Sequence, residues 1–227
     1  MPTVTSAELP LHRLDMDTYE QMVASGALEG EDIELLDGLL DDQERSREDP
    51  VHRIDVDTYN RMVLSGALED LHIELLDGLL VEMGSISPAH TVVVTLLMRH
   101  FAAAPQWWMQ VQCPVEIRPS SEPQPDLLVA AHRPPPGEHL RGALLAIEVA
   151  VSSHRRDRGR KAALYAEADI TTYWLVDVPG RAVEVRTRPG RNGYEHCEVY
   201  REDSIVPAPL EGVGDLNVAA LFAGVAG

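Results

Sequence analysis

The chain is poor in cysteine, in metal-binding histidine motifs and in long apolar runs, and each shortage excludes a class of protein. Its two cysteines, Cys113 and Cys197, are far apart and form no CxxC pair, so free thiols in a reducing compartment are expected. The nine histidines show no HxxxH or HExxH spacing, which argues against a zinc site. No apolar run approaches the roughly 18 residues of a membrane span, so no membrane segment is expected. The first residues carry no apolar signal core, which indicates a cytoplasmic protein.

Positive charge is also scarce, because the formal net charge is −18. This balance argues against broad nucleic-acid binding, which needs cations for phosphate contacts. The excess is uneven, however: residues 1–50 hold 14 acidic and 3 basic residues, whereas residues 51–227 hold 23 and 16. Five cations also fall within Arg155–Lys161. A local basic patch on an acidic protein therefore remains compatible with a polyanionic substrate.

Lysine is the scarcest charged residue, since Lys161 is the only one in the chain and the other 18 cations are arginine. Arginine is a wide fork that stays charged, whereas lysine is a compact point charge that can approach a reacting oxygen. This contrast favours a position that requires an amine. For this residue alone, a lysine that persists by chance on a solvated helix face is an equally good interpretation.

The N-terminal part of the chain contains a duplication. Leu11–Asp42 and Val51–Glu82 align without a gap at an offset of 40, and about two-thirds of the positions are identical. In each copy the sequence predicts a short helix with an Asp-Thr cap, which is Asp57-Thr58 in the second copy. An Asp-Gly turn follows the helix. Only the second copy is expected to continue into a strand, at Leu79–Met83, because the first runs into a charged linker. We therefore predict an acidic appendage at residues 1–50 and one domain at residues 51–227.

The rest of the chain alternates between helix and strand patterns. A helix is predicted from Ser87-Pro88 to about Ala103, another after the Ser-Ser-His break near residue 153, and a short one at Leu216–Phe222. Strands are predicted at six places, namely Trp107–Arg118, Asp126–Ala131, the apolar run around Glu148, Thr172–Val178, Ala182–Arg188 and Tyr194–Arg201. This order indicates an α/β or α+β domain with a mixed sheet flanked by helices.

Two carboxylates and an amine form the main candidate site. Asp126 begins one predicted strand and Glu148 lies within the next, so both can project from one face if the strands are neighbours. An acid within an apolar strand is costly unless a cation, a metal or a hydrogen bond meets it. On the following helix, the spacing i, i+4, i+8 aligns three side chains, namely Asp157, Lys161 and Tyr165. Glu74 is a possible third acid.

Such a set is suited to phosphodiester hydrolysis assisted by a divalent metal. Mg²⁺ (or Mn²⁺) prefers oxygen ligands and makes a bound water a better nucleophile. Lys161 would orient or deprotonate that water, or stabilise the developing oxyanion. From spacing alone, surface acids with an ion-paired lysine remain the more frequent explanation of such a pattern.

The order of these motifs resembles the Uma family of restriction endonuclease-like proteins, within the PD-(D/E)xK nuclease superfamily. The resemblance covers about residues 51–223 and rests on these segments: Glu74–Gly78, Ser87-Pro88 with His90, Gln124–Asp126, Glu148-Val149, Asp157-Arg158, Lys161, Tyr165-Ala166, Ile170 and Tyr173–Asp177. It implies a restriction-endonuclease-like fold and a homodimer that cleaves DNA. The chain departs from the superfamily pattern at Ala150, which stands where the lysine of a literal ExK would be.

The resemblance also implies roles for individual residues. Asp126 and Glu148 would hold the metal, and the carbonyl of Val149 would add a ligand. Glu74 would be a helix-borne catalytic acid, and Lys161 would replace the strand lysine of the superfamily from a helix.

Supporting roles are predicted for three further groups. His90 near a helix start would contact a phosphate or the metal shell, although a core or capping histidine is the more common case. The Tyr165 hydroxyl would support Lys161, unless the ring only packs against the sheet. Four arginines are candidates for nucleic-acid contact or for plain solvation: Arg155, Arg156, Arg158 and Arg160.

Taken together, these patterns predict a cytoplasmic, Mg²⁺-dependent endonuclease that acts on DNA. The alternative is a non-catalytic, nucleic-acid-associated or regulatory protein that keeps the nuclease fold. A third possibility, hydrolysis of another phosphodiester such as RNA, uses the same residues, and the sequence does not separate it from cleavage of DNA. For the first copy three hypotheses remain: it pairs with a partner subunit, it competes with the second copy for one docking surface as an acidic gate, or it is a tolerated tail.

Overall fold

The computed structural model describes residues 9–31, 33–42, 51–151 and 156–225. The chain divides into two compact units. Unit 1 comprises Met1–Met83 and Glu116–Pro123, and unit 2 comprises Gly84–Val115 and Gln124–Gly227. Both copies of the duplication thus lie in unit 1. Whether residues 51–227 behave as one domain stays a prediction.

Both copies in unit 1 fold into a helix followed by a two-stranded antiparallel hairpin. The elements of the first copy are α1 (Met16–Ala24), β1 (Ile33–Leu36) and β2 (Leu39–Asp42). Those of the second copy are α2 (Val56–Leu64), β3 (Ile73–Leu76) and β4 (Leu79–Glu82). The expectation that only the second copy continues into a strand is therefore wrong, because Leu39 and Leu40 extend the first copy before its charged linker begins.

Local sequence signals explain the shared motif. The Asp55 carboxylate accepts a hydrogen bond from the Thr58 backbone N–H at 2.7 Å, so α2 begins two residues earlier than the predicted Asp57–Thr58 cap. Asp77 and Gly78 both have positive φ, which is the requirement of a tight two-residue hairpin turn. A Cβ at Gly78 would lie 2.8 Å from the Arg53 Cβ, so the turn also needs the missing side chain.

The two copies share one hydrophobic core. It contains Leu14, Met22, Ala27, Leu28 and Leu40 from the first copy. The second copy contributes a larger set: Ile54, Val56, Tyr59, Met62, Ala67, Leu68, Ile73, Leu75 and Leu80. Since apolar burial is the main favourable contribution to folding, each copy is stabilised by the other.

Unit 2 is built on a six-stranded mixed sheet with the order β10-β9-β8-β7-β6-β5. The strands are β5 (Trp108–Val111), β6 (Leu127–Ala130), β7 (Leu145–Ala150), β8 (Thr172–Asp177), β9 (Ala182–Gly190) and β10 (Gly193–Arg201). β7 and β8 run parallel, and all other neighbours in this sheet are antiparallel. After β10 in the chain, β11 (Ile205–Val206) and β12 (Leu216–Asn217) form a small antiparallel hairpin.

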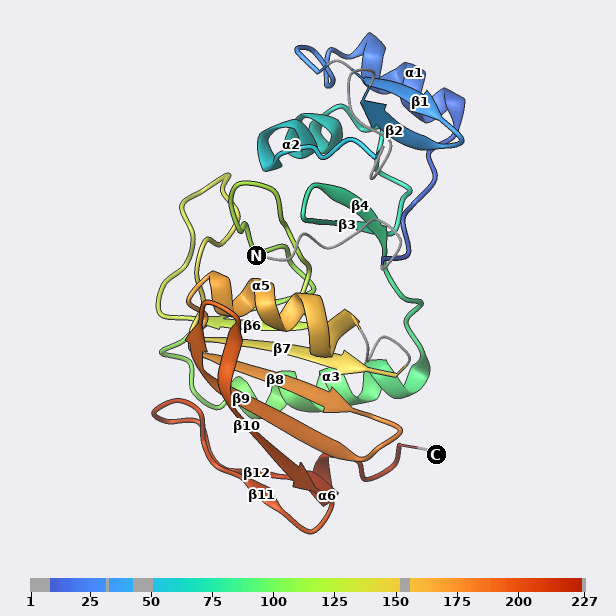
Figure 1. Ribbon diagram of the computed structural model, residues 1–227. Coiled ribbons are helices and arrows are strands. Elements are labelled where there is room, and N and C mark those ends of the chain that lie inside the picture. The colour runs from blue at the N-terminus through green and yellow to red at the C-terminus, as the bar shows by residue number, and fades with distance from the viewer. Residues whose placement is uncertain (1–8, 32, 43–50, 152–155, 226–227) are drawn as a thin grey trace. The chain divides into compact units, whose positions relative to one another are not determined.

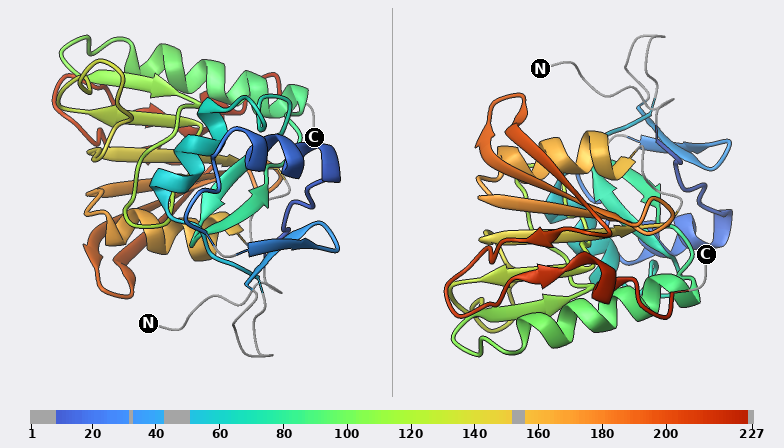
Figure 2. Two further views of the ribbon diagram at one scale, coloured as in Figure 1. Left: turned by 90° about the horizontal axis from the view of Figure 1, so that it is seen from above. Right: turned by 90° about the horizontal axis from the view of Figure 1, so that it is seen from below.

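Helices cover both faces of this sheet, as Figures 1 and 2 show. On one face lies α3 (Pro88–Phe101), which is capped by Ser87 and has proline in its first turn, together with the short α6 (Val218–Leu221). On the other face lies the segment that connects β7 to β8, which consists of η2 (Asp157–Lys161) and α5 (Ala162–Glu167). The main core fills the α3 face, where Leu97 and Phe101 pack with Ile147, Val149 and Trp174.

The chain therefore has the α+β fold with a mixed sheet that its sequence predicts. The predicted strand at Trp107–Arg118 is the largest difference, since only Trp108–Val111 pairs in the sheet and Glu116–Pro123 belongs to unit 1. Within the described ranges, no helix has both the length and the apolar character to cross a membrane. Cys113 and Cys197 are free thiols.

Candidate functional site

The two candidate acids lie on neighbouring antiparallel strands of unit 2. Glu148 is in the middle of β7, and Asp126 directly precedes the first residue of β6. The register pairs Leu127 with Ile147. Extended by one residue, it brings Asp126 opposite Glu148, and opposite residues of an antiparallel pair have Cβ atoms about 4.5–5.5 Å apart. The prediction of a shared face depended on the two strands being neighbours, and in the structure they are.

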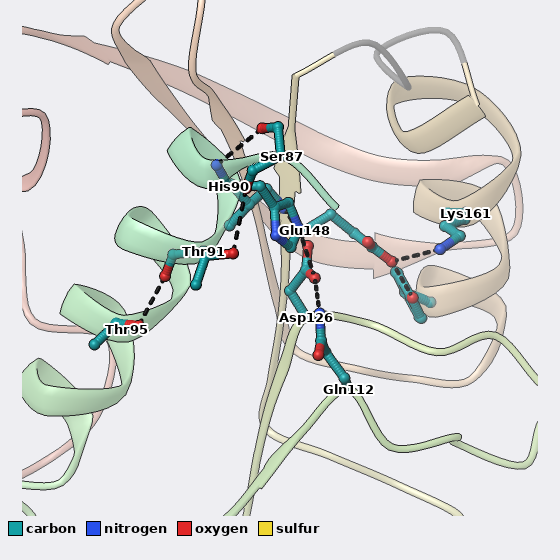
Figure 3. Close-up of polar contacts among 10 residues, drawn as sticks. Ser87, His90, Thr91, Thr95, Gln112, Asp126, Glu148 and Lys161 are labelled. Atoms are coloured by element: carbon teal, nitrogen blue, oxygen red, sulfur yellow. Dashed lines mark hydrogen bonds and ion pairs between the residues drawn. The ribbon is translucent and has the colours of Figure 1, made fainter. Parts of the chain in front are cut away.

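Three groups hold the Asp126 carboxylate at the start of β6. One carboxylate oxygen, Oδ2, accepts a hydrogen bond from the Val149 backbone N–H at 2.8 Å. The other, Oδ1, lies 2.9 Å from His90 Nε2 and 3.4 Å from Gln112 Nε2. Figure 3 shows His90 reaching this carboxylate from α3. Only 8% of Asp126 is exposed, so its position is fixed by these contacts rather than by solvent.

Glu148 is met by the amine and a phenol. Lys161 Nζ lies 3.0 Å from Glu148 Oε1, and the Tyr165 hydroxyl donates to the same oxygen at 2.6 Å. The side chains of Lys161 and Glu148 are 3% and 6% exposed, which makes this a buried ion pair. The only lysine of the chain is therefore directed to the acid of the central strand. It is not a solvated surface residue.

A π-helical turn places the amine. η2 spans Asp157–Lys161 and continues directly into α5, and Asp157, Lys161 and Tyr165 are all buried. The predicted stripe thus exists, although sequence predicts an ordinary α-helix there. π-helical turns recur at functional sites in proteins.

Tyr173 of β8 anchors this turn, because its hydroxyl donates to the Asp157 backbone carbonyl at 3.0 Å. Burial, and then the negative charges of Glu148 and Asp157, raise the pKa of Tyr173 well above its usual value. The phenol is consequently a permanent donor at ordinary pH.

The described arginines of the basic segment are engaged in ion pairs within unit 2. Arg158 contacts Asp177 at 3.0 Å and Glu184 at 2.6 Å, and the hydrogen bond to Glu184 is the main cause of its raised pKa. Arg160 pairs with Glu167 at 3.1 Å, and Arg156 lies 3.8 Å from its neighbour Asp157. The fourth candidate, Arg155, lies outside the described residues. Their contact with nucleic acid stays a prediction.

Glu74 belongs to unit 1, whereas the other described candidates belong to unit 2. It is fully buried within β3, so the expectation of a helix-borne acid is wrong. Ile73 before it favours a strand, and the Asp-Gly turn after Leu76 closes a hairpin. Its catalytic role stays a prediction.

The donor atoms of unit 2 are of the kind that a hard cation takes. Asp126 and Glu148 supply carboxylate oxygens, and the Val149 carbonyl faces the same end of β6 because N–H and C=O of one strand residue point to the same side. Among the described residues, no three His, Cys, Asp or Glu side chains gather closely enough to hold a metal. A cation here would therefore have two carboxylates, a backbone oxygen and water, which fits Mg²⁺.

Two residues of the site were not predicted from the sequence. Gln112 contacts Asp126 because β5 and β6 pair with Val111 opposite Leu127, which places the next residue beside the acid. Tyr173 fixes η2 from a neighbouring strand. Only the strand register identifies them, and the sequence does not give that register.

Comparisons with known proteins agree with this architecture. The family model Uma2, described as putative restriction endonuclease, matches residues 56–219, a range that begins inside the second copy. A solved structure of a putative nuclease belonging to DUF820 from Anabaena variabilis has 16% identity and a TM-score of 0.57. The alignment covers 68% of this chain and 91% of that one. At this identity the likeness shows a shared fold. No curated protein matches the chain.

Proposed function

Since the chain belongs to the Uma2 family of putative restriction endonucleases, we propose that it is a metal-dependent endonuclease that hydrolyses phosphodiester bonds of DNA. The nuclease-like fold is the frame for this proposal. The observation that carries it is the contact of the only lysine with Glu148, one strand away from Asp126.

Each residue of the site would have a distinct task. Asp126, Glu148 and the Val149 carbonyl would hold Mg²⁺ or Mn²⁺, with His90 and Gln112 fixing the Asp126 carboxylate. A metal held by these residues would supply an activated water and would neutralise charge on the phosphate.

The amine acts beside these ligands. Lys161 is paired with Glu148, and its N–H groups would stabilise a developing phosphate oxyanion. Tyr165 shares the same carboxylate oxygen and thereby limits the positions that Glu148 can take.

DNA would be held by the basic segment, which includes Arg155, Arg156, Arg158 and Arg160. In the structure, the three described members are in ion pairs, so phosphates would have to compete with Asp177, Glu184 and Glu167 for them. Two sites in a homodimer would suit cleavage of both strands of a duplex.

One observation favours a second candidate, a non-catalytic nucleic-acid-associated or regulatory protein with the same fold. In the described part of the chain, donors of the protein itself already meet Asp126 and Glu148, and the engaged arginines offer little free positive charge. A pseudo-enzyme would retain this self-compensated cluster for stability.

Cleavage of supercoiled plasmid with Mg²⁺ or Mn²⁺ separates the two candidates. The wild type is compared with Asp126→Asn, Glu148→Gln and Lys161→Met, and metal binding is followed by calorimetry. We expect each of the three variants to lose about 10²–10³ in rate, the range for a group that stabilises transition-state charge.

Glu202→Gln is the matched control, because it removes a carboxylate ion-paired with Arg181 on the exposed surface. It should keep the wild-type rate and metal affinity. A wild type that binds neither metal, or that binds one and leaves plasmid, single-stranded DNA and RNA intact, would remove the enzyme proposal and favour the second candidate.

A further inference from the structure

The two copies in unit 1 exchange backbone hydrogen bonds reciprocally. The N–H of His12 in the first copy donates to the carbonyl of Leu80 in the second at 2.9 Å. The N–H of His52 in the second copy donates to the carbonyl of Leu40 in the first at 2.8 Å. His12 and His52 are equivalent at the offset of 40, and so are Leu40 and Leu80. Each copy thus places its leading segment on the hairpin of the other.

The strand pairing repeats this exchange. Leu11 pairs with Val81 in an antiparallel bridge, and Val51 pairs with Asp41 in another. Adding 40 to the first-copy residue of one bridge, and subtracting 40 from its second-copy residue, gives the other bridge. The contact therefore obeys the rule of a two-fold interface, in which residue i meets residue j and j meets i.

A small cavity lies on the same pseudo-two-fold axis. Its volume is about 20 Å³, enough for roughly one water molecule. The lining consists of Leu11, His12, Leu14, Gly38, Leu39 and Leu40, together with the equivalent residue of the second copy for every one of them. Such a matched lining is what a subunit interface shows at its symmetry axis.

We propose that the first copy is a built-in substitute for a second subunit. The described parts of the two copies form an internal pseudo-dimer, and the first copy occupies a self-complementary face that the second copy would otherwise present to another molecule of this chain. A homodimer of the whole protein then has to use a different surface. This inference is independent of the nuclease proposal.

Side-chain divergence shows that the first copy is adapted to this position. Glu31 stands where the second copy has Leu71. Its carboxylate accepts a hydrogen bond from the Thr58 hydroxyl at 2.7 Å and lies 3.1 Å from His52 Nε2. These bonds join the two copies, which favours a built-in partner over a tolerated tail.

Covalent connection favours the internal pair over an external one. Only residues 43–50 separate the described ends of the two copies. A short connection gives a tethered partner an effective concentration of about a millimolar, well above that of any free chain in a dilute assay. The face is therefore occupied from within at ordinary protein concentrations.

Cysteine cross-linking in the full chain tests the exchange directly. Cys113 and Cys197 are first replaced by serine, and Leu11→Cys is combined with Val81→Cys. Facing residues of an antiparallel pair lie within the range of Cα separations that a disulfide spans. We expect oxidation to give a cross-link within one chain, seen on a non-reducing gel as a monomer that migrates faster than the reduced chain. A covalent dimer, or no cross-link, would overturn the internal pair.

A second pair tests self-complementarity. Val51→Cys with Val81→Cys joins residues that are not partners in the internal pair but become partners when the second copies of two molecules meet. In the background that lacks Cys113 and Cys197 and carries no further change, no covalent dimer should form. Met22→Asp, which buries a charge in the first copy, should release the face and give covalent dimers between chains.

Met62→Asp is the matched control, because Met62 is the equivalent core residue of the second copy and is also fully buried. It disrupts the face itself, so no dimer should form. A Met22→Asp variant that yields no interchain cross-link would show that the second copy does not pair with itself. If this variant fails to fold, Met22→Ala, which leaves a cavity in place of a charge, is put through the same test with the same two outcomes.

Discussion

The ion pair between Lys161 and Glu148 makes a quantitative prediction about stability. Both side chains are almost fully buried and their charged atoms are 3.0 Å apart. Removing one partner of a buried pair leaves an uncompensated charge and typically costs about 3–5 kcal/mol. We expect Lys161→Met to cost about 3 kcal/mol, at the lower end, because the Tyr165 hydroxyl still donates to Glu148.

A double-mutant cycle isolates the contribution of the pair. Glu148→Gln should also destabilise the chain, whereas Lys161→Met combined with Glu148→Gln removes both charges and should cost less than the sum of the two changes. The expected coupling is about 2 kcal/mol, within the range for residues in direct contact. Since small domains are stable by about 5–15 kcal/mol, each variant should still fold.

Urea unfolding followed by tryptophan fluorescence is the appropriate assay. All three tryptophans of the chain are in unit 2, so the signal reports the unit that contains the pair. Glu202→Gln, at an exposed ion pair, should cost less than about 1 kcal/mol. Additive losses in the cycle, within about 0.5 kcal/mol, would refute the buried-charge reasoning.

Three further changes test other parts of the structure. Burial, and next the charge of a neighbouring glutamate, raise the pKa of Glu122 from 4.5 to about 7. The folded chain therefore binds a proton that the unfolded chain has released, and stability should fall as the pH rises from about 4.5 to 7. Glu122→Gln should remove up to about 3 kcal/mol of this dependence in urea unfolding at pH 5 and pH 8. Gly78→Ala should lower the stability of the chain more than Gly137→Ala. Both glycines have positive φ, but only at Gly78 would the added Cβ lie against backbone atoms. Thermal unfolding of the two variants measures the difference. Tyr165→Phe removes a hydroxyl that donates to Glu148, so it should cost about 1–3 kcal/mol; no loss in urea unfolding would contradict the reported contact.

Much of the fold of unit 2 follows from local sequence patterns. The helix at Pro88–Phe101 has a serine cap and a proline in its first turn, and the strands around Glu148 and Trp174 are continuous apolar runs. These signals act over a few residues, so sequence determines them well. The break of the long extended segment after Val111 is different, because Glu116–Pro123 folds with residues that are distant in sequence.

The candidate site could be anticipated only in part. Two acids and a single amine stand out in the sequence because each is chemically unusual in its surroundings. Gln112 does not, since a glutamine in a loop is ordinary and only the β5–β6 register brings it to Asp126. The resemblance to the nuclease family implies a helix at Glu74, whereas Glu74 and its neighbours form a strand.

The pairing of the two copies could not be predicted from local sequence signals. The repeat is obvious in the sequence, yet one of its reciprocal hydrogen bonds joins His12 to Leu80, far along the chain, and the other joins His52 to Leu40 across the charged linker. No periodicity specifies which hairpin a leading segment selects. The outcome depends on a shared apolar core, which exists only after both copies have folded.

The π-helical turn at Asp157–Lys161 has a consequence for the spacing of the chain. A π turn holds one more residue than an α-helical turn, and each residue of an α-helix rotates the next by about 100°. Deletion of a single residue, such as Gly159, would convert the segment to a regular α-helix. Every side chain before the deletion would then be rotated by about 100° around the helix axis. The helix could then not both follow β7 in its present orientation and keep the contact between Lys161 and Glu148.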